Sequence, residues 1–134
     1  MIKVVLDTNI IVSANLKAQG IEALVVRLAA SGKIQMCVSP PILAEYESVL
    51  RRPKFKFTLD LIEGVLQLIR ETAVLFTDLP TIKALADEKD NCFLECADAA
   101  SAHFLVTGNT RHFPTALQDH AASYCPPALG DRRA

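Results

Sequence analysis

Three acidic side chains, Asp7, Glu45 and Asp90, and one amide, Asn109, stand near the ends of predicted strands or the starts of predicted helices. In an α/β sheet these positions gather at one edge, where ligands bind. Carboxylates that lie close together repel one another, and a hard cation with oxygen ligands, Mg²⁺ or Mn²⁺, relieves the repulsion. Such an ion activates water and stabilises charge on a phosphate during in-line attack. The pattern therefore predicts a divalent metal site at the edge of an α/β sheet.

Asp7 carries the strongest of these signals. It closes the apolar run Val4-Val5-Leu6, which is typical of a strand buried on both faces, and two more polar residues follow it. A carboxylate at such a place is costly unless it has a partner. The other acids are weaker when taken singly, because Asp90 fits a helix N-cap equally well and Glu45 is typical of a solvated helix position.

The elements that must position these residues alternate between strands and helices. This alternation predicts a three-layer α/β/α sandwich with a mainly parallel sheet of four to five strands. The chain is expected to form a single domain over residues 1–134, with residues 128–134 disordered. Strands are predicted at residues 2–6, 34–38, 73–76, 103–107 and 123–125, helices at 20–31, 39–52, 58–69, 81–86 and 90–102, and a turn or short helix at 9–14.

Composition narrows the class of protein. Half of the 134 residues are hydrophobic, which supports a substantial core, and 14 basic residues against 15 acidic ones argue against a generally basic nucleic-acid surface. No apolar run approaches the roughly 18 residues of a membrane span, and the start does not resemble a signal peptide. We therefore expect a cytoplasmic protein that does not associate with membranes and whose four cysteines are reduced.

Two further clusters invite a functional interpretation. The first is a basic cluster interleaved with phenylalanines, made of Arg51, Arg52, Lys54 and Lys56. It could bind RNA phosphates. The favoured interpretation is a solvated loop whose aromatic rings pack against the core. The second pairs Cys92 and Cys96 with His112 or His120. It lacks the tight paired spacing of structural zinc sites, so zinc is disfavoured.

Several motifs together resemble those of a known family. Residues 5–14, Val-Leu-Asp-Thr-Asn-Ile-Ile-Val-Ser-Ala, resemble the opening motif of PIN-domain nucleases. Residues 39–45, Ser-Pro-Pro-Ile-Leu-Ala-Glu, resemble the second motif, and residues 90–97 with 104–109 resemble the third and fourth. The resemblance extends over residues 2–113 and is greatest to the VapC type, the toxins of toxin–antitoxin pairs.

This resemblance implies a particular set of site residues. Asp7, Glu45 and Asp90 would be the catalytic, metal-binding acids, and Thr8, Asn9 and Thr107 would support them. Asn109 would be an auxiliary metal ligand where many family members carry another aspartate; an amide oxygen can contact a metal but adds no negative charge. The implied activity is a Mg²⁺- or Mn²⁺-dependent endoribonuclease, a homodimeric toxin restrained by a small antitoxin.

Two alternatives stay open. An aspartate-dependent phosphatase also places an aspartate after its first strand, but it normally has a second aspartate two residues later, where this chain has Asn9, and no clear lysine partner follows. A PIN-like module that binds RNA or protein without turnover is the other, because Asn109 departs from the acidic pattern.

Overall fold

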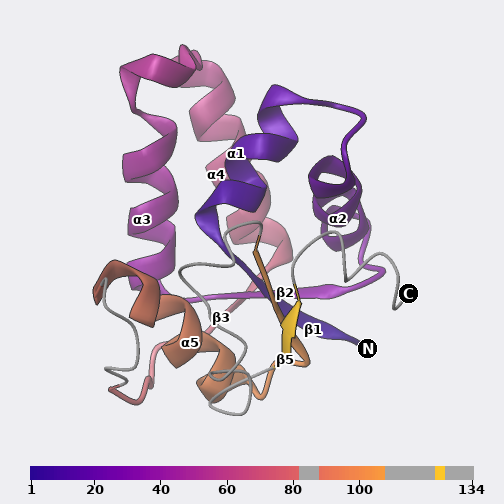
Figure 1. Ribbon diagram of the computed structural model, residues 1–134, viewed down its shortest axis with the longest axis vertical. Coiled ribbons are helices and arrows are strands. Elements are labelled where there is room, and N and C mark those ends of the chain that lie inside the picture. The colour runs from indigo at the N-terminus through magenta and orange to yellow at the C-terminus, as the bar shows by residue number, and fades with distance from the viewer. Residues whose placement is uncertain (82–87, 108–122, 126–134) are drawn as a thin grey trace.

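Five parallel strands form the centre of the molecule (Figure 1). The computed structural model describes residues 1–81, 88–107 and 123–125, with the backbone alone at 88–90 and 123–125. The sheet order is β3-β2-β1-β4-β5, and every neighbouring pair is parallel. The strands are β1 (Lys3–Leu6), β2 (Gln35–Val38), β3 (Val74–Leu75), β4 (Phe104–Val106) and β5 (Ser123–Cys125).

Helices cover the sheet in two layers. Four helices, α1 to α4, pack on one another, whereas α5 lies against β1, β2 and β4 and also contacts α3 (Figure 1). This arrangement follows from right-handed crossovers, which change face when the chain passes from β3 back across to β4. The α/β/α fold class is thereby confirmed. The helices are α1 (Thr8–Leu16), α2 (Ile21–Ala30), α3 (Pro40–Leu50), α4 (Leu59–Thr72) and α5 (Glu88–Ala100), with a 3₁₀ turn at Pro53–Phe55.

Local sequence signals explain where several helices begin and end. The Ser39 hydroxyl accepts a hydrogen bond from the Ile42 N–H at 3.3 Å, and the Thr58 hydroxyl accepts one from the Leu61 N–H at 3.1 Å, so both residues are N-caps of their helices. Gly32 follows the end of α2 with a φ of +79°, a left-handed conformation that favours glycine.

Other boundaries differ from the expectations. The first helix starts at once after β1 and runs to Leu16, rather than spanning residues 9–14, because Asp7 itself acts as its N-cap. Helix α5 starts at Glu88, so Asp90 is its third residue and the N-cap alternative for that residue is wrong. Residues 82–86 of the helix expected at 81–86, and the disorder expected at 128–134, lie outside the described residues.

The core centres on β1 and the helix faces that cover it. Val5 and Leu6 are fully buried, as the uninterrupted apolar run predicted, and the inward faces of α1, α3 and α5 pack against them. Within the described residues, no helix combines the length and the apolar character that crossing a membrane requires. Because β1 is the central strand, its carboxyl end lies in the middle of this sheet edge.

Candidate active site

Asp7 lies at the point where the strand order reverses. From β1 the chain proceeds to β2 and β3 on one side, and it later returns to β4 on the other side. In open α/β sheets, ligands bind beside the carboxyl ends of the strands at such a switch point. Asp7 follows β1 directly, and its backbone N–H donates to the Val106 carbonyl of β4 at 2.9 Å. The fold therefore places this carboxylate where a ligand site is expected.

Thr8 and Thr107 both donate hydrogen bonds to the Asp7 carboxylate. Its Oδ1 accepts from the Thr8 backbone N–H at 2.8 Å, and its Oδ2 accepts from the Thr107 hydroxyl at 2.6 Å. Asp7 is 6% exposed and Thr107 is fully buried. The register explains the contact, because Leu6 pairs with Val106 and the next residues of both strands then lie side by side. These charge-assisted bonds offset the cost of burying the carboxylate and fix its orientation.

Thr8 has an unsatisfied hydroxyl beside this carboxylate. Its Oγ1 is buried and has no hydrogen-bond partner among the residues that the structure describes. An orphaned buried hydroxyl costs roughly 1–3 kcal/mol, and such groups in native structures commonly mark an ion or a water. A fixed carboxylate and a buried hydroxyl oxygen are the hard ligands that a hydrated divalent cation takes, so these residues fit such an ion.

Glu45 is carried to the same region by α3. It is partly exposed, and the next residue, Tyr46, is fully buried and donates its hydroxyl hydrogen to the Leu6 carbonyl. The pKa of Tyr46 lies well above its usual value, first because burial disfavours the phenolate and second because Asp7 is negatively charged. Tyr46 is thus a neutral donor at physiological pH. It ties the helix of Glu45 to the strand end that carries Asp7.

Asp90 lies in the first turn of α5, where the positive end of a helix favours a carboxylate. Its neighbour Asn91 is buried, and Phe93 of the same helix contacts Tyr46. The described side chains, which do not include that of Asp90, contain no group of three or more His, Cys, Asp and Glu residues that could hold a metal. Asn109, the auxiliary ligand of the prediction, lies outside the described residues.

The cysteine and histidine side chains that the structure describes have structural roles. Cys37, Cys92 and Cys96 are buried, and burial raises the pKa of the Cys96 thiol to about 12, which keeps it protonated at neutral pH. The His103 Nδ1 accepts from the Lys3 backbone N–H at 3.0 Å and so joins two neighbouring strands. His112 and His120, the suggested zinc partners, lie outside the described residues.

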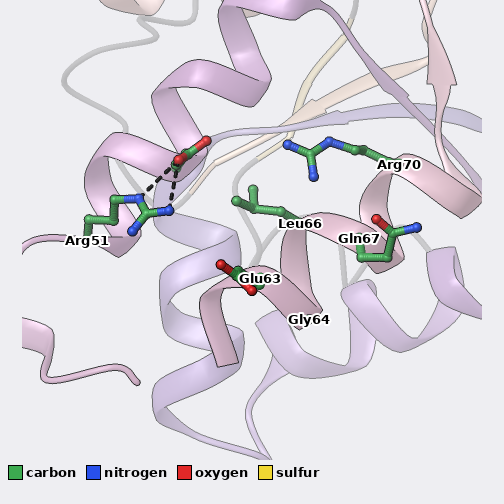
Figure 2. A pocket seen from close by; sticks show the side chains of 7 residues that line it. Arg51, Glu63, Gly64, Leu66, Gln67 and Arg70 are labelled. Atoms are coloured by element: carbon green, nitrogen blue, oxygen red, sulfur yellow. Dashed lines mark hydrogen bonds and ion pairs between the residues drawn. The ribbon is translucent and has the colours of Figure 1, made fainter. Parts of the chain in front are cut away.

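The basic segment forms the tip of the hairpin between α3 and α4. Arg51, Arg52, Lys54 and Lys56 are exposed, while the rings of Phe55 and Phe57 are partly buried against the core and stack at 5.7 Å. Behind the tip, α3 and α4 line a cavity of about 540 Å³ in which Arg51 pairs with Glu47 at 3.0 Å (Figure 2). Its lining includes neither Asp7 nor Glu45.

A parallel five-stranded sheet between helices, with an acidic residue at its switch point, defines a protein of the α/β class. A family model for the PIN domain matches residues 3–111, so the chain belongs to the PIN domain family, as the motifs indicated. An uncharacterized protein of Methanocaldococcus jannaschii, MJ1680, is 30% identical over 111 residues, which cover 81% of this chain and 71% of that protein.

A solved structure shares the fold. It is a chain in the crystal structure of VapBC2 from Rickettsia felis bound to a DNA fragment from their promoter. The two chains superpose with a TM-score of 0.62 at 18% sequence identity, over 92% of this chain and 98% of the other. This similarity shows that the chain shares its fold with a protein of known crystal structure.

Proposed function

We propose that this protein is a Mg²⁺- or Mn²⁺-dependent endoribonuclease that acts as the toxin of a toxin–antitoxin pair. The observation that carries the proposal is the Asp7 carboxylate, buried at the switch point and held by donors from Thr8 and Thr107. Membership of the PIN domain family supports nuclease chemistry. The fold shared with a VapBC2 chain supports the toxin assignment.

The proposed metal ligands are Asp7, Glu45 and Asp90, with Asn109 as an auxiliary oxygen donor. Bound Mg²⁺ or Mn²⁺ would promote ionisation of water and offset charge on the phosphate oxygens. The protein itself keeps the oxygen ligands in fixed positions. Thr107 and the Thr8 N–H fix the direction of the Asp7 carboxylate, and the Thr8 hydroxyl offers a further buried oxygen beside it.

The test compares cleavage of labelled RNA by the purified protein with and without Mn²⁺ or Mg²⁺. We expect cleavage with either ion, loss of cleavage in EDTA, and at least about 100-fold slower turnover in Glu45→Gln and Asp90→Asn, because each removes a negative ligand. The matched control is Glu63→Gln on the exposed face of α4. RNA binding without cleavage would indicate the non-catalytic module, and a phosphoaspartyl adduct on Asp7 would indicate the phosphatase; either result would contradict the proposal.

The basic tip has the exposed charges and core-packed rings of the favoured solvated loop, and we propose in addition that its charges bind the RNA backbone. Replacing Arg51, Arg52, Lys54 and Lys56 with alanine should weaken RNA binding and reduce the slope of log affinity against log salt by about 0.7 for each phosphate that is no longer neutralised. Fluorescence anisotropy at several salt concentrations measures both quantities. A Lys17→Ala, Lys33→Ala variant removes exposed charge elsewhere and is expected to leave the slope nearly unchanged. Equal slopes in the two variants would remove the tip from the proposed RNA surface.

The proposed partners follow from the toxin assignment. They are the RNA substrate, a second copy of the chain in a homodimer, and a small antitoxin that blocks the acidic site, all in the cytoplasm. The Rickettsia felis structure, whose VapBC2 is bound to promoter DNA, supports the antitoxin proposal. A neighbouring upstream gene for a short DNA-binding protein would be the expected companion.

A further inference from the structure

The side chain of Tyr46 touches all three segments that carry the predicted acids. It belongs to α3 and directly follows Glu45. Its hydroxyl donates to the carbonyl of Leu6, the residue before Asp7. Its ring packs against Phe93 of α5, three residues after Asp90, with the ring centroids 6.4 Å apart. One fully buried residue thus joins the end of β1, the middle of α3 and the first turns of α5.

Apolar packing alone does not explain the hydroxyl. Phenylalanine would fill the same space against Phe93 without burying a polar group, and a buried tyrosine hydroxyl is favourable only when it has a partner. Here the partner is a backbone carbonyl at the end of β1. The bond therefore adds a directional link between α3 and the strand end, which apolar packing alone would not supply.

We propose that Tyr46 is a positioning residue, which fixes the segments of Asp7, Glu45 and Asp90 at the separation that a divalent metal requires. The proposal rests on the proposed function. A metal site tolerates little displacement of its ligands, because metal–oxygen distances vary by only a few tenths of an ångström. The hydrogen bond from Tyr46 to Leu6 joins α3 to the end of β1, and its two residues are the direct neighbours of Glu45 and Asp7. It is therefore well placed to limit the displacement of these two ligands.

The test is Tyr46→Phe, which keeps the ring and removes the hydroxyl. We expect Mn²⁺ binding, measured by electron paramagnetic resonance, to weaken about tenfold, the scale found when a residue that orients metal ligands is removed. We expect kcat for RNA cleavage at a fixed Mn²⁺ concentration to fall by a similar factor, with KM for RNA unchanged. Saturating Mn²⁺ should restore part of the lost kcat, because the defect lies in the spacing of the ligands.

The matched control is Val49→Ala, which removes buried apolar volume from the same helix one turn further on. It should lower the unfolding temperature at least as much as Tyr46→Phe does, while Mn²⁺ affinity stays near that of the wild type. Equal losses of affinity in the two variants would show that general loosening is responsible and would overturn the positioning role. Unchanged affinity in Tyr46→Phe would overturn it as well.

The two proposals fail in different ways. If the wild type binds Mn²⁺ but does not cleave RNA, the nuclease proposal fails, and the comparison of Mn²⁺ affinities still decides the role of Tyr46. If Tyr46→Phe matches the wild type in an active enzyme, only the positioning proposal fails. A wild-type protein that binds no Mn²⁺ would overturn both.

Discussion

Replacing Asp7 with asparagine is expected to lower RNA cleavage by about 10³-fold while the protein stays folded. The large effect on rate follows from the loss of the negative charge at the centre of the proposed metal site. The small effect on folding follows from the contacts of the residue. Asparagine caps helices about as well as aspartate does, and its side-chain oxygen can still accept from the Thr8 N–H.

Single-turnover cleavage and thermal unfolding of the same preparation measure the two effects. The control is Asp60→Asn in the first turn of α4, which makes the same chemical change at an exposed position and is expected to cleave at the wild-type rate. If Asp7→Asn cleaves as fast as the wild type, Asp7 is not a metal ligand and the site has been assigned to the wrong place.

The second large effect is expected for Thr107→Val. Valine has nearly the same shape as threonine but cannot donate to the Asp7 Oδ2, which would lose a hydrogen bond of 2.6 Å in a fully buried place. Removing one partner of a buried, charged hydrogen bond costs about 1–3 kcal/mol of unfolding free energy. Because the carboxylate would also lose its fixed direction, we expect metal affinity and turnover to fall by as much as about 100-fold.

Two other substitutions separate the loss of this hydrogen bond from a general loss of stability. Thr107→Ser keeps the donor, so it should retain most of the activity even if removal of the methyl group costs some stability. Thr72→Val removes a hydroxyl that donates to the Leu68 carbonyl at 2.8 Å within α4, far along the chain from the acids, and should leave Mn²⁺ affinity unchanged. A fully active Thr107→Val variant would show that this hydrogen bond is not needed at the site.

Much of the fold follows from local signals that are strong in this chain. The apolar run of β1, the capping residues Ser39 and Thr58 and the glycine after α2 each act as short-range physics predicts. The alternation of elements then leads to the parallel sheet, since few other topologies accommodate it. The sequence predicts the start of α5 two residues late, because Asp90 resembles a cap while the first turn already begins at Glu88.

The contacts within the site are harder to predict. Asp7-Thr8-Asn9 indicates a site by its chemistry, yet the same residues also form a helix start, with Asp7 as the N-cap. The bond between Thr107 and Asp7 depends on the register of β1 with β4, which pairs residues about 100 positions apart. The sequence pattern places Tyr46 only on the apolar side of its helix. The clue in the sequence is the tyrosine side chain itself, because a hydroxyl among the apolar residues of a buried helix face requires a hydrogen-bond partner.

The location of a bound metal tests the central claim most directly. A crystal soaked in Mn²⁺ and measured at a wavelength where manganese scatters anomalously gives that location without reference to any activity. We predict a peak about 2.0–2.3 Å from a carboxylate oxygen of Asp7, at the carboxyl end of β1, with Glu45 and Asp90 among the surrounding ligands. A peak elsewhere on the chain, with no ion at Asp7 under saturating Mn²⁺, would contradict the claim that the fold assembles a metal site at this edge.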